Sequence, residues 1–209
     1  MSEMEAFVSN RDIVNKMLRI EHSGSKINWC WPVAVLGFLF GPAGAAIWFF
    51  RRKMSRIASI LLVLGIVFAA INVLFSVFVY NNADVKGLLA SSEAFFSGEI
   101  GLYEFGEIAT DFLHTAAAPW FMVATFLMSV VELAFGIGLP VVCGMYAVYL
   151  YKEYAVKRII AYRATNIDPR YYQLGLSSVG GISGGMMAVG IVCCWLIQVI
   201  SENITAIFI

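Results

Sequence analysis

The chain has 209 residues and no net charge, and 60% of its residues are apolar, against roughly 45–50% in an ordinary soluble domain. Only 13% are charged, where about 25% is usual, and the mean hydropathy is +0.80. This composition excludes a disordered chain, a basic nucleic-acid-binding domain and an ordinary soluble enzyme. We expect an all-α, polytopic membrane helical bundle that has the lipid bilayer as its surroundings and no nucleic-acid partner.

Residues 1–26 predict an amphipathic helical segment and not a secretory signal. Acidic residues stand among the first five positions, and apolar residues recur at helical spacing, including Phe7, Val14 and Met17. We expect this segment on the cytoplasmic side. Two placements stay open: packing on the protein's own loops, or lying on the membrane surface with its basic residues toward the headgroups.

Residues 27–209 predict a single membrane domain that contains four apolar blocks. The blocks cover 27–50, 55–80, 119–150 and 181–200. A spanning helix needs about 20 residues, so the second and fourth blocks fit as they stand. The third block is longer than a bilayer requires, and Pro140, which follows two glycines, is its predicted kink. Its basic continuation, 151–180, is expected in water, with a turn at Asp168-Pro169.

The first block, 27–50, is interrupted by Gly41-Pro42, which leaves two pieces that are each too short to span. It is therefore either one kinked spanning helix or a re-entrant segment that returns to the same side. A re-entrant block leaves Lys86 as the only outer cation, which agrees better with the positive-inside rule, and we favour it. The predicted fold is thus three spanning helices plus one re-entrant or fourth spanning block.

Charge also orients the loops between the blocks. Lys and Arg residues are concentrated in 51–56 and 151–180, and two crossings separate these segments, so both are expected in the cytoplasm. The segment 81–118 is acidic, and we expect it outside. It is also apolar enough to hold one or two short helices.

Two stretches, 27–58 and 145–185, carry short motifs. The motif residues are Asn28-Trp29, Gly41-Pro42, Trp48, Arg52-Lys53-Met54, Tyr151, Lys157-Arg158-Ile159 and Gly180-Gly181-Ile182-Ser183. Together they resemble a family of uncharacterised bacterial inner-membrane proteins, catalogued as domain of unknown function 2628. The family often has a tyrosine where Arg51 stands and a threonine where Ile182 stands. The resemblance implies a multi-pass location in the bacterial cytoplasmic membrane and brings no established activity or catalytic residues.

Glu132 is the candidate intramembrane polar site. It lies among apolar residues of the third block, where an ionisable side chain costs a few kcal/mol and is by default a functional hypothesis. A proton-coupled transporter would use such a carboxyl. The other interpretations are a structural hydrogen bond to Gln198 or Ser129, and a position near the membrane interface.

Small residues at four-residue spacing predict close packing of membrane helices. Such pairs stand at the start of the fourth block and within the first: Gly180 and Gly184, Gly181 and Gly185, and Gly37 and Gly41. We expect them to pack helices within the chain, with a homodimer as the alternative.

A set of basic residues is expected at the cytoplasmic headgroup level. It comprises Arg51, Arg52, Lys53, Arg56, Lys157 and Arg158. These residues either set the orientation alone or bind anionic headgroups, at about 1 kcal/mol each.

The sequence carries no pattern typical of a catalytic or metal site. The four cysteines lie in apolar stretches without Cys-x-x-Cys spacing, and His22 and His114 belong to no triad or His-Glu-x-x-His motif. We expect no enzyme, no metal and no cofactor. The leading hypothesis is a structural or partner-binding membrane subunit. The alternative is a small transporter or channel component that uses Glu132.

Overall fold

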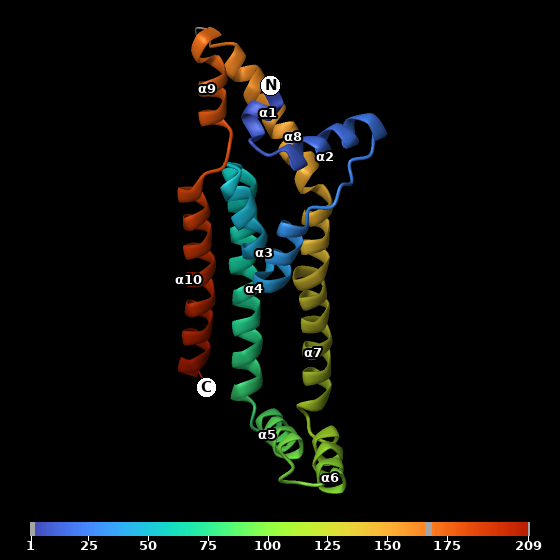
Figure 1. Cartoon of the computed structure of the whole chain (residues 1–209). Helices are drawn as coiled ribbons and strands as arrows, with labels where there is room; N and C mark the ends of the chain where they lie inside the picture. Colours follow the sequence, from blue (N-terminus) through green and yellow to red (C-terminus); the bar gives the residue numbers. More distant parts are fainter. Residues whose placement is uncertain (1–2, 166–168, 209) are drawn as a thin grey trace. The chain divides into compact units, whose positions relative to one another are not determined.

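The computed structural model describes residues 3–165 and 169–208, and these contain helices and no strand (Figure 1). In chain order the helices are α1 (Glu3–Val8), α2 (Arg11–Ser23), α3 (Trp31–Arg51), α4 (Ser55–Asn81), α5 (Ala83–Ser97), α6 (Leu102–Leu113), α7 (Ala118–Glu132), the π-helical turn η1 (Leu133–Gly138), α8 (Leu139–Arg163), α9 (Pro169–Val179) and α10 (Gly184–Phe208). Four segments are long and apolar enough to cross a membrane: Trp31–Arg51, Ser55–Asn81, Ala118–Arg163 and Tyr171–Ile207. The predicted all-α fold is confirmed, and these segments indicate a multi-pass membrane protein.

The chain divides into two compact units. Unit 1 comprises Met1–Ile66 and Ala134–Leu196, and unit 2 comprises Val67–Leu133 and Ile197–Ile209. The predicted turn at Asp168 lies outside the described residues.

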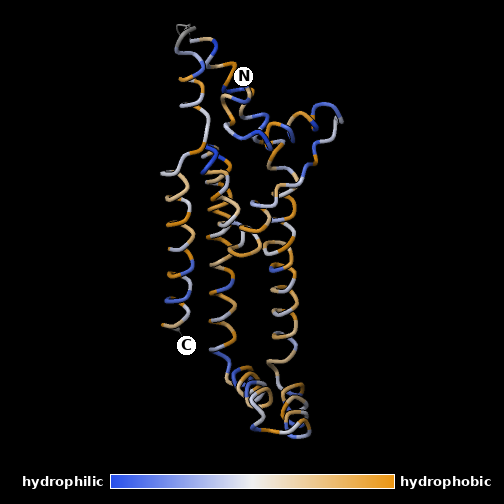
Figure 2. Tube along the Cα trace, in the orientation of Figure 1, coloured by the Kyte–Doolittle hydropathy of each residue, from blue (hydrophilic) through white to orange (hydrophobic). Residues whose placement is uncertain are grey.

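The core of unit 1 is built along α8. Its buried side chains include Phe7 from α1, Met17 from α2, Phe49 from α3 and Tyr151 from α8. In α2 the buried residues Val14, Met17 and Ile20 share one face because they recur at helical spacing. Packing of α2 on the protein itself therefore accounts for the apolar face of the predicted amphipathic segment. Figure 2 shows polar residues gathered at α1, α2 and α9, and apolar residues along α3.

The segment α3 is broken, and its two arms run back on one another (Figure 1). At the break Phe40 has φ −131° and Gly41 has φ 62° and ψ −155°, a combination outside the helical region that glycine adopts readily. A Cβ atom on Gly44 would lie 2.8 Å from the carbonyl carbon of Leu36. Eight residues of straight helix would separate these positions by roughly 12 Å. The chain therefore reverses direction at the predicted Gly41-Pro42 interruption.

Backbone hydrogen bonds join the residues just before α3 to α8. Cys30 and Asn28 donate backbone hydrogen bonds of 2.8 and 3.0 Å to the carbonyl oxygens of Gly144 and Met145. Further along the arm, a Cβ atom on Gly37 would lie 2.8 Å from the Cβ atom of Pro140. Because Gly37 has no side chain, the first arm of α3 can approach α8 closely.

The third apolar block and part of its basic continuation form one helical segment of 46 residues, Ala118–Arg163, which is more than twice the length that a bilayer needs. The π-helical turn η1 interrupts it just before Pro140. Proline has no N–H group, and its ring collides with the carbonyl group four residues earlier, so the helix widens there. The kink predicted at Pro140 is therefore a local π-helical turn.

The helix of the fourth apolar block begins three residues after the first residue of that block. Ser183 accepts a hydrogen bond from the backbone N–H of Met186 at 3.2 Å, which is the contact of an N-cap residue. Helix α10 therefore begins at Gly184, whereas Gly180 and Gly181 lie in the link from α9. The segment 151–180, predicted only as basic and water-exposed, contains the end of α8 and all of α9.

Unit 2 holds the acidic segment 81–118 as the paired helices α5 and α6. Asn82 caps α5 by accepting hydrogen bonds from the N–H groups of Asp84 and Val85. A small core of Val79, Val85, Phe112 and Ala118 joins the pair to the ends of α4 and α7. The segment was expected to hold one or two short helices, and it holds two, α5 and α6.

Candidate functional site

Glu132 lies exposed at the end of α7. Its carboxyl group makes no hydrogen bond or ion pair with any described residue. The hydroxyl of Ser129 instead donates to the carbonyl oxygen of Thr125 at 3.0 Å, and Gln198 is exposed on α10. Among the described residues, Glu132, Ser129 and Gln198 make no hydrogen bond to one another.

The surroundings of Glu132 are polar along one line and apolar beside it. Thr125, Ser129 and Glu132 are four and three residues apart, so they share one side of the helix, and all three are exposed. Phe126 and Leu133 beside them are 68% and 61% exposed. A carboxyl at such a surface can accept hydrogen bonds or take up a proton. The polar side formed by Thr125, Ser129 and Glu132 is therefore suited either to binding a partner or to proton transfer.

Arg52 departs from its predicted place at the headgroups. Only 4% of its surface is exposed, and its guanidinium carbon lies 5.8 Å and 5.1 Å from the ring centres of Trp48 and Tyr151. One Nη atom donates to the carbonyl oxygen of Val8 at 3.1 Å. The Nε atom of Arg52 and the hydroxyl of Tyr151 are buried without a hydrogen-bond partner among the described residues.

Lys53 is partly exposed and also bonds to the protein itself. Its Nζ atom donates to the carbonyl oxygens of Ser178 and Val179, at 2.7 and 3.3 Å, at the end of α9. A cation at the C-terminus of a helix satisfies free carbonyl groups and opposes the negative end of the helix dipole. Lys53 itself has φ 60°, and this left-handed residue turns the chain out of α3. The predicted headgroup role is therefore corrected for the buried Arg52, and for the partly exposed Lys53 it stays a prediction.

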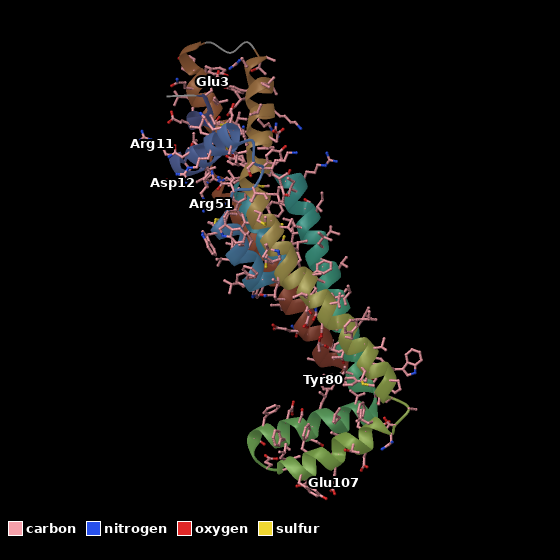
Figure 3. All side chains as sticks on the ribbon, turned by 90° about the vertical axis from the view of Figure 1, so that its right-hand side faces the viewer. Glu3, Arg11, Asp12, Arg51, Tyr80 and Glu107 are labelled. Atoms are coloured by element: carbon pink, nitrogen blue, oxygen red, sulfur yellow. The ribbon has the colours of Figure 1, made fainter. Side chains whose placement is uncertain are left out.

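The other basic residues of the predicted set remain at the surface. Arg51, Arg56, Lys157 and Arg158 are all exposed. The guanidinium carbon of Arg158 lies 5.5 Å from the ring centre of Tyr154. Figure 3 shows Arg51 at the end of α3. These four side chains are available to anionic headgroups.

The six glycines of the predicted packing pairs have different surroundings. Gly37 approaches Pro140, and Gly41 forms the reversal of α3. Gly180 packs against Phe7 of α1, and Gly181, with φ 63°, donates its N–H to the carbonyl oxygen of Phe7 at 2.6 Å. Both glycines therefore pack on the N-terminal helix and not along α10. A Cβ atom on Gly184 or Gly185 would meet no described atom within 4 Å.

Sequence reasoning missed an ionic cluster that joins the first helix to the end of α8. The guanidinium of Arg163 donates to one carboxylate oxygen of Glu3, and the hydroxyl of Tyr172 donates to the other at 3.0 Å. The hydrogen bond from Arg163 holds the pKa of Glu3 below its ordinary value. Figure 3 labels Glu3 in α1 and Arg11 and Asp12 in α2. No local pattern could reveal a pairing across 160 residues.

The described residues contain no group of three or more His, Cys, Asp or Glu side chains that could hold a metal ion. The four cysteines are free thiols, and Cys30 and Cys194 are buried. In comparisons with known proteins, no family model, curated protein or solved structure matches the chain.

Proposed function

We propose that the chain is a membrane-embedded structural subunit that binds another membrane protein through the exposed side of α7. In this proposal the line of Thr125, Ser129 and Glu132 meets a spanning helix of the partner. That helix presents a hydrogen-bond donor or a cation to Glu132.

The observation that carries the proposal is the exposed carboxyl of Glu132 among exposed apolar side chains. An ionisable group that faces lipid costs several kcal/mol unless a partner satisfies it. Polar side chains hydrogen-bond across membrane helices, with about 1 kcal/mol per contact. A partner helix that covers this side of α7 removes the cost, and lipid alone does not.

We further propose the orientation and the membrane. Exposed Arg51, Arg56, Lys157 and Arg158 would lie at the cytoplasmic headgroups, which places α5 and α6 outside. The hairpin α3 would enter the bilayer and return to the cytoplasmic side, because its two arms run in opposite directions. The bacterial cytoplasmic membrane and the kinship with domain of unknown function 2628 belong to this proposal, on the motifs quoted above.

Photo-crosslinking in membranes tests the partner. A photoreactive residue at Leu133 is expected to give one discrete adduct, whereas the same residue at Leu74, equally apolar and exposed on α4, gives only diffuse lipid products. Glu132→Ala should abolish the adduct, and Glu132→Gln should retain part of it because an amide still accepts a hydrogen bond. An adduct of the chain with itself identifies a homodimer instead. Identical products from Leu133 and Leu74 overturn the proposal.

The alternative function, a transporter or channel component, draws on a specific neighbour of Glu132. The π-helical turn η1 follows it directly, and such turns are frequent at functional sites. A carboxyl beside a deformable turn can alternate between protonated and ionised forms. If this alternative holds, vesicles with the parent chain show proton or solute flux that Glu132→Gln abolishes while leaving helicity unchanged.

A further inference from the structure

Unit 2 contains an open groove between α4 and α10, whose surface is mostly apolar but which holds several polar side chains. Its volume is about 350 Å³, and its polar lining consists of Asn72 and Ser76 from α4 and Ser201, Glu202 and Thr205 from α10. The apolar side chains of Val73 and Ala206 complete it. The groove lies five to nine residues from the end of α4, which is roughly 7 to 14 Å along the helix. It therefore opens near one end of two apolar segments.

Three of the polar side chains of this lining already donate a hydrogen bond within their own helix. Ser76 and Thr205 donate their hydroxyl hydrogens to the carbonyl oxygens of Asn72 and Ser201, at 3.0 and 2.9 Å. Asn72 donates an amide hydrogen to the carbonyl oxygen of Phe68 at 2.9 Å. Each of these side chains keeps an oxygen atom that can still accept a hydrogen bond. The groove is thus richer in acceptors than in donors.

Glu202 gives the groove its charge. It is the one charged residue of the lining, and its carboxylate has no hydrogen-bond or ion-pair partner in the described part of the chain. Glu202 is exposed beside apolar residues of α4 and α10, and a counter-charge stabilises a carboxylate at such a surface. One negative charge among several neutral oxygen acceptors is complementary to a single cation that carries hydrogen-bond donors.

The volume of the groove favours an organic cation over a bare metal ion. One water molecule occupies about 30 Å³ of liquid, so the groove exceeds by far the room that a bare metal ion takes. Its volume falls at the lower end of the range for small organic ligands. The apolar walls offer a contact for hydrocarbon, which an inorganic cation does not use.

We propose that this groove binds the primary ammonium group of a small organic monocation, with Glu202 as counter-ion and the oxygen atoms of Asn72, Ser76 and Ser201 as acceptors. The hydrocarbon part of the ligand contacts Val73 and Ala206. The ammonium group belongs either to the ethanolamine headgroup of a lipid or to a soluble amine. This proposal is independent of Glu132.

Calorimetric titration of the full chain in phosphatidylcholine nanodiscs tests this proposal, with n-propylammonium chloride as the probe. The expected result is saturable binding of one probe per chain. Glu202→Gln should weaken it by at least about tenfold, as the loss of a charge-assisted hydrogen bond predicts. Glu107→Gln removes an exposed carboxylate of α6 in the same unit and should leave the dissociation constant unchanged. Asn72→Leu, which keeps the charge and removes an acceptor, should weaken binding by a smaller factor.

A second series in nanodiscs that contain phosphatidylethanolamine identifies the source of the ammonium group. A weaker apparent affinity for the probe indicates competition by the lipid headgroup, and an unchanged affinity indicates a soluble amine. The proposal is overturned if the probe gives no saturable heat, if sodium chloride alone gives the same heat, or if Glu202→Gln binds as the parent does while its helicity is retained.

Discussion

The guanidinium group of Arg52 donates a hydrogen bond of 3.1 Å to the carbonyl oxygen of Val8, 44 residues earlier in the chain. This contact joins the end of α3 to the end of α1 inside the core of unit 1. The rings of Trp48 and Tyr151 lie against the same guanidinium, which therefore has apolar and polar contacts at once. Arg52 thus fastens the N-terminal helix to the α3 hairpin.

Removal of this side chain should weaken unit 1. We expect Arg52→Ala to lower the free energy of unfolding by about 2 kcal/mol, because a buried hydrogen bond from a charged donor is lost. Arg51→Ala, the exposed neighbour, should change it by no more than about 0.5 kcal/mol. Thermal unfolding in detergent, followed by circular dichroism, measures both. An equal loss of unfolding free energy in the two variants would show that the buried contacts of Arg52 do not stabilise unit 1.

Tyr151→Phe should not destabilise the protein. Tyr151 is 0% exposed, and its hydroxyl has no hydrogen-bond partner among the described residues. A buried unsatisfied hydroxyl costs about 1–3 kcal/mol, so its removal should raise the melting temperature or leave it unchanged. A fall in melting temperature in the same assay would mean that the hydroxyl has a partner, such as a buried water.

The reversal of α3 depends on the absence of a side chain at Gly44. A Cβ atom there would lie 2.8 Å from both the carbonyl carbon of Leu36 and the Cβ atom of Phe40, so the two arms would separate. We expect Gly44→Ala to abolish folded protein or lower its yield in detergent severely, as judged by size-exclusion chromatography. Gly185→Ala is the matched control. It meets open space in α10 and should be neutral or stabilising, by up to about 1 kcal/mol from helix propensity.

The contact of Glu3 with Arg163 and Tyr172 predicts a pH dependence for the docking of α1. Because the folded-state pKa of Glu3 is lowered from its ordinary value of 4.5, the stabilisation is complete above that value and is lost as the pH falls through the folded-state pKa. Hydrogen exchange of the α1 amides should therefore be slower in the parent than in Glu3→Gln at neutral pH. The two should converge in acid.

A matched variant isolates this effect from general acid sensitivity. Glu153→Gln removes an exposed carboxyl of α8 and should exchange as the parent does at every pH. A parent and a Glu3→Gln variant with equal exchange at neutral pH would contradict the assigned role of Glu3.

Features with a local cause could be predicted from the sequence, and those with a distant cause could not. The interruption at Gly41-Pro42 and the disturbance before Pro140 follow from the backbone chemistry of glycine and proline. Arg51 and Arg52 are neighbours of the same type in the sequence, but they differ in burial. Only Arg52 points inward, because the chain turns at Lys53 and α1 packs against that side. Likewise, Gly180 is part of a typical helix-packing pair, but its neighbour is Phe7, which is remote in sequence.

For Glu132, the sequence predicts the residue but not its contacts. The sequence identified the residue, because an ionisable side chain among apolar neighbours is conspicuous. It could not show that neither Ser129 nor Gln198 contacts the carboxyl, since both lie at plausible spacings or depths. Because the carboxyl of Glu132 has no contact within the described chain, a partner is needed to satisfy it in the bilayer.

Cysteine accessibility tests directly whether α3 enters and leaves the bilayer on one side. In a variant without the four native cysteines, single cysteines are placed at Ser25 before α3, at Ser55 after it, and at Ser97 in α5, all exposed positions. An impermeant thiol reagent is applied to intact and to opened cells. If α3 is re-entrant, Ser25→Cys and Ser55→Cys react only after opening, whereas Ser97→Cys reacts in intact cells. Reaction of Ser25→Cys in intact cells, with Ser55→Cys still protected, would make α3 a spanning helix and rule out the re-entrant course.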